Sequence, residues 1–220
     1  MQAMDHTTYM SLREGAHVLE ADGSGDKVLR LRDGRMLKLF RRKRLLSSAL
    51  LYPYARRFAN NAQALQQLGV PSPEIIGVYR IPSIQRDAVY YAPLAGETLR
   101  QLLHKQEGAQ TLRAQLGQFI AHLHSLGIYF RSLHLGNVVL TPERELGLID
   151  IADLQRQSRP LRERQRVRNF HHVLRYAEDR QWLLGDDNGA AFLEGYRQEL
   201  EQGQENHQPR LLNTLRQLLD

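Results

Sequence analysis

The residues best suited to chemistry lie in the stretch FRSLHLGNVVL, residues 130–140, and in the triplet LID that ends at Asp150. Within the stretch, Gly136 allows a tight backbone turn, and Asn137 precedes Asp150 by thirteen residues. This composition is typical of a loop that handles nucleotide phosphate. Ser132, however, stands where such chemistry uses a carboxylate, because a serine hydroxyl does not usefully accept a proton near neutral pH. The sequence therefore indicates either a phosphate-handling enzyme or a related chain without that activity.

The first part of the chain is predicted to form the β-rich lobe that holds one side of such a site. Alternating apolar residues broken by turn chemistry predict a three-stranded antiparallel meander and two later strands. The predicted strands are HVLEA, KVLRLRD, RMLKLF, IIGVYR and DAVYYA. One helix interrupts them, because Phe58, Ala62, Leu65 and Leu68 recur at helical spacing before Gly69. We assign this lobe to residues 1–93.

The second part, residues 94–220, is predicted to be a mostly helical lobe. Leu99, Leu102 and Leu103 indicate one helical turn, and a long apolar stripe runs from Leu112 to Leu126. Two short strands, NVVL and LGLID, bracket the loop with the turn TPERE between them. Three further helical patterns follow from residue 162, and the polar segment 201–210 reads as a linker or a surface turn.

Composition and charge are those of a soluble globular chain with anionic partners. Apolar residues make up 42% and charged residues 25%, which does not favour disorder. The net charge of +6 suits a phosphate-rich glycolipid, an acidic membrane surface, a nucleotide or nucleic acid, and charge alone does not choose among them. The absence of cysteine excludes disulfides and thiolate metal sites.

The termini and apolar runs predict a cytoplasmic protein. The segment 1–15 carries acids and lacks the apolar run of a secretory signal. The most apolar run, residues 45–55, is too short to span a bilayer and contains Pro53. We therefore expect no transmembrane anchor.

The order of these elements resembles the protein-kinase-like fold. In addition, LHLGNVVL followed by LID is similar to the HGDLHPGN…IDF arrangement of sugar and aminoglycoside kinases. Over roughly residues 15–175, the chain resembles the bacterial lipopolysaccharide core kinases of the Kdo and heptose family, and among them the chains labelled toluene tolerance proteins. The resemblance implies an α+β, bilobal fold, with a small antiparallel β lobe containing one helix and a mostly helical second lobe. It implies ATP and Mg²⁺ as cofactors.

The resemblance also implies roles for particular residues, each with a plainer alternative. Lys38 would pair with the α- and β-phosphates of ATP, or is an exposed strand lysine. Asn137 and Asp150 would coordinate Mg²⁺, an oxygen-only task, or are an ordinary turn residue and a cap. Gly23 and Gly25 would belong to a loop that covers the phosphates, or to a simple hairpin turn. His134 matches a histidine of the pattern and is given no chemical role. We expect Lys38, Asn137 and Asp150 to converge.

Two departures from the family pattern argue that activity has degenerated. Ser132 replaces the catalytic aspartate, and losing a positioned base typically costs about 10²- to 10⁴-fold in rate. Asn61 stands where the family has the glutamate that holds the strand lysine, and no acid occurs from Gly34 to Pro73. Lys38 should thus lack its usual partner. Asp153 is either a relocated acid or, as we favour, a solvated loop residue.

A basic run indicates a possible membrane contact. It comprises Arg41, Arg42, Lys43 and Arg44, and an apolar segment with tyrosines follows it. Such a run is usually a solvated face, but this composition also suits an anionic leaflet or a glycolipid phosphate.

Three functional hypotheses follow. The first is a kinase-like protein of lipopolysaccharide core phosphorylation at the inner face of the inner membrane, transferring the γ-phosphate of ATP to a sugar hydroxyl if active. The second is a pseudokinase that regulates an envelope enzyme. The third, nucleic-acid binding, has no motif in its favour.

Overall fold

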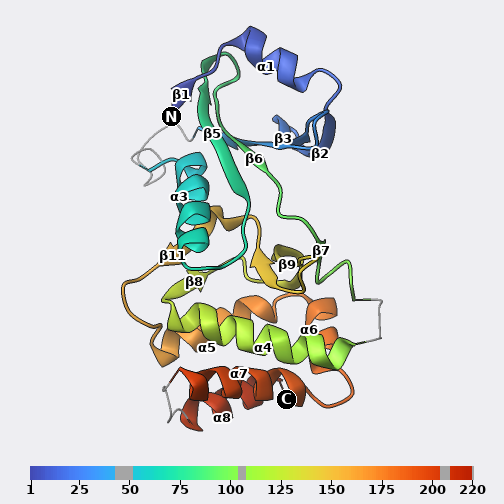
Figure 1. Cartoon of the computed structure of the whole chain (residues 1–220), viewed down its shortest axis with the longest axis vertical. Helices are drawn as coiled ribbons and strands as arrows, with labels where there is room; N and C mark the ends of the chain where they lie inside the picture. The colour runs from blue at the N-terminus through green and yellow to red at the C-terminus, as the bar shows by residue number, and fades with distance from the viewer. Residues whose placement is uncertain (43–51, 104–107, 204–208, 220) are drawn as a thin grey trace. The chain divides into compact units, whose positions relative to one another are not determined.

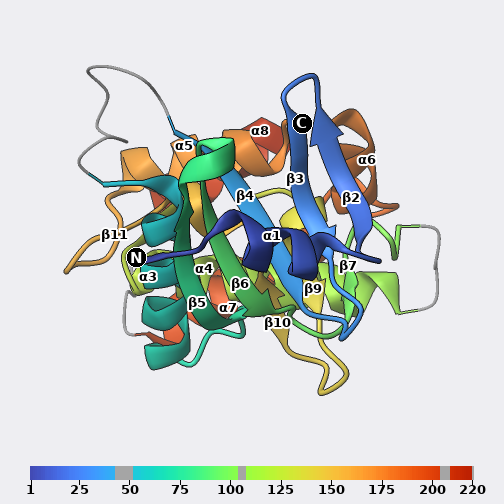
Figure 2. The ribbon, with the colours of Figure 1, turned by 90° about the horizontal axis from the view of Figure 1, so that it is seen from above.

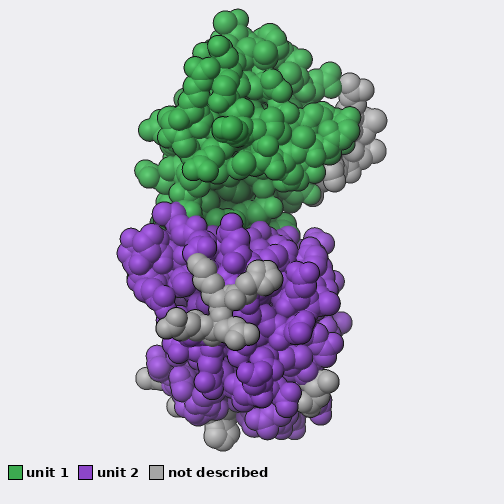
Figure 3. Space-filling model, turned by 90° about the vertical axis from the view of Figure 1, so that its right-hand side faces the viewer, with its two compact units in different colours: residues 1–94, 149–153 green, residues 95–148, 154–220 purple. Residues whose placement is uncertain are grey.

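The structure, a computed structural model of the whole chain, describes residues 1–42, 52–103, 108–203 and 209–219. It forms two compact units, residues 1–94 with 149–153 and residues 95–148 with 154–220 (Figure 3). We call them unit 1 and unit 2. The sequence-based boundary at residue 93 placed residues 149–153 in the second lobe. They pack in unit 1 because the short 3₁₀-helix η3 (Ile151–Asp153) lies against helix α3 (Tyr54–Gln67).

Unit 1 is built on a six-stranded sheet with the order β1-β5-β6-β4-β3-β2 (Figures 1 and 2). All neighbours are antiparallel except β1 and β5. The five predicted strands are all present, and β2, β3 and β4 form the predicted meander. The strands are β1 (Gln2–Ala3), β2 (His17–Asp22), β3 (Gly25–Arg30), β4 (Met36–Arg41), β5 (Glu74–Ile81) and β6 (Arg86–Ala92).

The helix α3 confirms the predicted helical pattern. Phe58, Ala62 and Leu65 are buried, and the chain leaves the helix through Gly69 at φ +73°. Unit 1 also contains a second helix, α1 (His6–Arg13), where the sequence analysis expected only one. Its start is capped by Asp5, whose side chain accepts the N–H of Thr8. A short 3₁₀-helix, η1 (Pro82–Ile84), joins β5 to β6.

The core of unit 2 is a pair of helices, α4 (Ala109–Ser125) and α7 (Ala190–Gln202), which lie side by side (Figure 1). Glycines make this approach possible. A Cβ atom on Gly117 would lie 2.0 Å from the carbonyl oxygen of Phe192, and one on Gly195 would lie 2.0 Å from that of Ala114. Leu116, Ile120 and Leu123 of the stripe predicted for α4 are buried as well.

The remaining elements of unit 2 match most of the expected patterns. Segment 99–103 is a hydrogen-bonded turn and not the predicted helical turn, and α6 was not predicted. The predicted linker falls mainly on residues 204–208, outside the described residues. The elements are β7 (Glu97–Thr98), β8 (Ile128–Phe130), η2 (Leu135–Asn137), β9 (Val138–Leu140), β10 (Leu146–Leu148), β11 (Leu154–Arg156), α5 (Glu163–Val173), α6 (Ala177–Leu184) and α8 (Pro209–Leu219).

A buried polar network ties α4, α5 and α7 to the end of β8. Asn169 donates to the carbonyl of Phe130 at 2.7 Å, so its side-chain oxygen faces His124 Nε2 at 3.2 Å and accepts that proton. His124 Nδ1 then accepts the hydroxyl of Tyr196 at 2.9 Å. The histidine is thus neutral, and burial together with the charge of Arg166 lowers its pKa to about 3.

This network predicts a loss of stability in acid. The unfolded chain binds a proton on His124 below a pKa of about 6.5 and the folded chain does not, so the free energy of unfolding falls between that pH and pH 3. The contribution is about 2 kcal/mol between pH 6.5 and pH 5. In urea unfolding, the free energy of unfolding of His124→Gln should depend less on pH than that of the parent chain, because the His124 contribution is removed. His17→Gln, on the exposed strand β2, should show the same pH dependence as the parent chain. Equal slopes for both variants would contradict the neutral assignment.

Candidate functional site

The centre of the candidate site in unit 1 is an ion pair between Lys38 and Asp150. Lys38 Nζ lies 2.5 Å from Asp150 Oδ1, although the two residues are 112 positions apart. Lys38 lies on β4, and this strand pairs with β3 on one side and with β6 on the other. Its side chain is 15% exposed and that of Asp150 is 49% exposed. The pair therefore presents a carboxylate to solvent and keeps most of the lysine covered.

Aromatic rings surround the lysine end of this pair. Its ammonium lies 6.0 Å from the ring centroids of both Phe40 and Phe58, which is within cation–π range. Tyr91, on β6, packs against Phe58, and burial and the charge of Asp150 raise the pKa of its hydroxyl. Sequence reasoning missed Tyr91. The alternation of DAVYYA predicted the strand but did not show which tyrosine lies near the carboxylate.

The segment that carries Asp150 is held by Asn61. Asp150 has φ +53°, in the left-handed region, and the chain then enters η3. Asn61 Nδ2 donates to the carbonyl oxygen of Ile151 at 2.7 Å. A glutamate at this position could not make that bond, because an ionised carboxylate only accepts. Asn61 therefore fixes the backbone next to Asp150.

This arrangement changes the expectation for Lys38. The sequence analysis expected it to lack its usual partner, because residues 34–73 contain no acid. The structure supplies a carboxylate from residue 150. Asp153, expected as a solvated loop residue, lies in η3 with one carboxylate oxygen buried.

The glycine turn of unit 1 joins β2 to β3. Asp22 Oδ1 accepts the N–H of Ser24 at 2.8 Å, and this bond holds the pKa of Asp22 below its usual range. Arg86 donates to the carbonyl of Ser24 at 2.6 Å. Gly25 has φ +107°, which explains the glycine there. A role of Gly23 and Gly25 in covering phosphate remains a prediction, and Asp22 already uses one of the amides that it would need.

In unit 2 the loop after β8 holds Asn137 in one orientation. Asn137 Nδ2 donates to the carbonyl oxygen of Ser132 at 2.9 Å, so the amide oxygen is not used in that bond. His134 Nδ1 accepts the N–H of Gly136 at 3.1 Å, which agrees with a structural role for the histidine. Ser132 is half-buried, and its backbone carbonyl is the group that accepts the bond from Asn137.

A buried carboxylate that sequence reasoning missed braces this loop. Asp179, in the first turn of α6, is 1% exposed and accepts the N–H of Leu135 at 3.0 Å. It also accepts two bonds from Arg100, at 2.9 and 2.6 Å. The Arg100 guanidinium in turn lies 4.5 Å from the ring centroid of Tyr176. The sequence analysis predicted no helix over α6 and therefore gave Asp179 no role.

Comparison with known families decides the identity of the fold. The model of the lipopolysaccharide kinase (Kdo/WaaP) family matches residues 11–196, most of the 220-residue chain. The chain belongs to this lipopolysaccharide kinase family. Comparison with curated proteins finds no match. The α+β, kinase-like bilobal fold implied by the resemblance is thereby confirmed.

In this member of the lipopolysaccharide kinase family, the predicted site residues fall in both units. Unit 1 contains Gly23, Gly25, Lys38 and Asp150, and it brings the last two into contact. Unit 2 contains Ser132 and Asn137, which the loop hydrogen bond joins. The predicted roles of these residues toward ATP and Mg²⁺ remain predictions.

The residues present fit the chemistry of ATP and Mg²⁺. Mg²⁺ is usually held by one or two carboxylates together with substrate phosphates, and Asp150 offers a half-exposed carboxylate. Asn137 keeps its amide oxygen out of the bond to Ser132. Among the described residues, no group of three or more His, Asp or Glu side chains forms a metal site.

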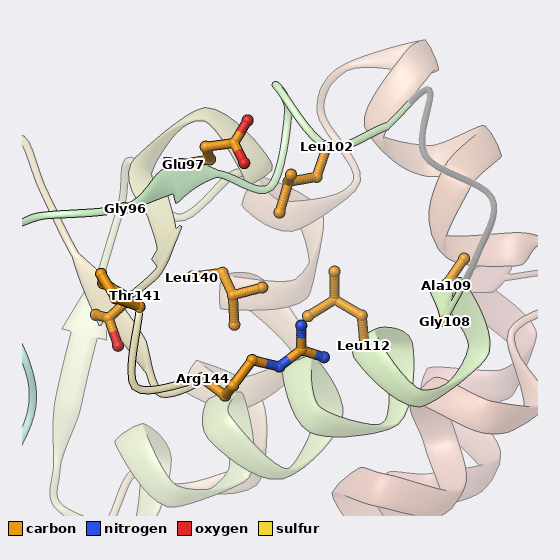
Figure 4. Close-up of a pocket in the computed structure, with 10 residues that line it drawn as sticks. Gly96, Glu97, Leu102, Gly108, Ala109, Leu112, Leu140, Thr141 and Arg144 are labelled. Atoms are coloured by element: carbon orange, nitrogen blue, oxygen red, sulfur yellow. The ribbon is translucent and has the colours of Figure 1, made fainter.

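Three further observations on this member of the lipopolysaccharide kinase family bear on the predictions. Of the basic run, Arg41 and Arg42 are exposed, whereas Lys43 and Arg44 lie outside the described residues. Within the described ranges, no helix is both long enough and apolar enough to span a bilayer. A pocket of about 390 Å³ in unit 2 is lined by leucines and by Arg144 (Figure 4), and its described lining includes none of the predicted site residues.

Proposed function

We propose that this chain is a nucleotide-binding, kinase-like protein of lipopolysaccharide core biosynthesis with weak phosphotransfer. The observation that carries the proposal is the Lys38–Asp150 pair, because it brings together in unit 1 an ammonium suited to phosphate and a carboxylate suited to a metal ion. The family membership supports a kinase reaction, and the reaction proposed is transfer of the γ-phosphate of ATP to a sugar hydroxyl.

The roles of the chain follow from what phosphoryl transfer requires. ATP with Mg²⁺ supplies the transferable phosphate and the neutralising charge. Lys38 would bind phosphate oxygens, and Asp150, with Asn137 as the second predicted ligand, would hold the metal. Because the transition state is loose, transfer can proceed without a strong base, but slowly. Ser132 at the base position therefore predicts a low rate and not a loss of nucleotide binding.

Nucleotide-dependent stabilisation tests this proposal. ATP with Mg²⁺ should raise the free energy of unfolding of unit 1, by about 2.7 kcal/mol when ATP is 100-fold above its Kd. Asp150→Asn should remove the part of this gain that depends on Mg²⁺. Asp33→Asn is the matched control, because Asp33 lies in the β3–β4 turn and an asparagine there can still accept the N–H of Arg35. An unchanged response of Asp150→Asn would contradict the metal-binding role.

A scaffold without nucleotide is the second candidate. One observation favours it: the side chain of Asp22 accepts the N–H of Ser24, an amide that a phosphate-covering loop would need. Such a protein would regulate an envelope enzyme as a pseudokinase. It predicts no stabilisation at millimolar ATP, with or without Mg²⁺.

We also propose a position at the inner face of the inner membrane. The exposed Arg41 and Arg42 support it, because basic side chains are attracted to anionic headgroups.

A further inference from the structure

Four cationic or titratable side chains gather in unit 2 where β8 meets α5, elements that pack against each other (Figure 1). Arg131 directly follows β8 and precedes Ser132. Arg168 lies on α5, and Arg175 follows its end, one residue beyond the C-cap Leu174. These three arginines are exposed, and His172 lies among them, half-buried.

The hydrogen bonds of His172 fix the position of Arg175. The guanidinium Nη2 of Arg175 lies 2.9 Å from His172 Nδ1, and a guanidinium only donates, so Nδ1 carries no proton. The proton is therefore on Nε2, which faces the hydroxyl of Tyr129 at 3.3 Å. Burial and the positive charges of Arg175, Arg131 and Arg168 lower the pKa of His172. The histidine thus anchors Arg175 and adds no charge to the cluster.

No carboxylate neutralises these arginines in the part of unit 2 that the structure describes. Two other arginines of the unit have carboxylate partners: Arg100 binds Asp179, and Arg197 binds Glu194 and Glu201. The helix dipole favours a cation near the end of α5, but it does not explain Arg131, which comes from β8. Positive charge held together without a counter-charge is a feature of anion-binding sites.

We propose that Arg131, Arg168 and Arg175 form a subsite for an acidic group of the acceptor, a phosphate or carboxylate carried by the glycolipid next to its reacting sugar. This inference rests on the proposed function, because it assumes a glycolipid acceptor. Arg131 is adjacent in sequence to Ser132, so an anion bound here would be held close to the residue at the base position. The guanidinium groups suit phosphate and carboxylate because their planar forks bind both in bidentate fashion.

Acceptor binding, measured apart from turnover, tests the subsite. The full chain is titrated with a lipopolysaccharide core oligosaccharide that retains its phosphate and carboxylate groups, with the same oligosaccharide after dephosphorylation and carboxyl reduction, and with inorganic phosphate. We expect Arg131→Gln and Arg175→Gln each to weaken binding of the intact oligosaccharide about 10-fold. The treated oligosaccharide should bind parent and variants equally weakly. Arg216→Gln on α8 is the control for the loss of one positive charge.

The possible results are separable from those of the nucleotide test. Equal binding of intact oligosaccharide by Arg131→Gln, Arg175→Gln and Arg216→Gln would overturn the subsite, even if ATP binds. Binding that depends on both arginines would support the subsite, even if ATP does not bind. Loss of binding to phosphatidylglycerol vesicles alone, with oligosaccharide binding intact, would overturn it in favour of a membrane contact.

Discussion

The Ser132→Asp variant is expected to transfer phosphate to a core oligosaccharide about 100-fold faster than the parent chain. A positioned general base contributes about 10²- to 10⁴-fold, and we expect the lower end because Asn61 still replaces the family glutamate. The hydrogen bond from Asn137 goes to the backbone carbonyl of Ser132, so the substitution leaves it in place. The measurement is kcat with radiolabelled ATP at saturating Mg²⁺.

Two comparisons make this gain interpretable. Ser158→Asp adds the same charge to an exposed loop of unit 2 and should leave kcat unchanged. ATP binding by Ser132→Asp should equal that of the parent chain. If Ser132→Asp is no faster than Ser158→Asp, the missing carboxylate does not limit the rate, and the gap at Asn61 or another one dominates.

Replacing Asp179 by alanine is expected to cost roughly 3 kcal/mol of stability in unit 2. The substitution leaves the N–H of Leu135 without its acceptor and Arg100 without its carboxylate. The cost should stay below that of a fully buried pair because the Arg100 side chain is 34% exposed and can turn to water. The amide hydrogens of residues 132–137 should consequently exchange about 100-fold faster, as measured by hydrogen exchange.

The neighbouring acid provides the control for this change. Glu178→Ala lies on the same helix and is exposed, so its effect should stay within about 0.5 kcal/mol. Similar protection of residues 132–137 in both variants would show that Asp179 does not brace the loop.

Most of the fold could be predicted because local chemistry determined it. The turns at 23–26 and 33–34 fixed the hairpins of β2, β3 and β4, and the apolar stripe of α4 marks residues of that helix that are buried, among them Leu116, Ile120 and Leu123. The helix α1 was missed because its 8 residues bury only Tyr9. The helix α6 was missed for a different reason: its buried residues, Asp179, Trp182 and Leu183, include an aspartate and form no regular apolar pattern.

The candidate site was less predictable because its bonds join distant residues. The partner of Asn61 is a backbone carbonyl 90 positions away, and Asp179 binds Leu135 across 44 positions. In both bonds one partner is a backbone group, and a backbone group cannot be identified from residue type. The partner of Lys38 was not predicted because residues 34–73 contain no acid and Asp150 was expected to bind the metal.

Calorimetric titration of the full chain with ATP, with and without Mg²⁺, tests the central claim most directly. We predict binding that requires Mg²⁺ and is lost in Lys38→Met, while Lys27→Met, an exposed lysine on the adjacent strand β3, binds as the parent does. Absence of binding at millimolar ATP, or equal binding by both lysine variants, would contradict the assignment of Lys38 and Asp150 as the nucleotide-binding pair.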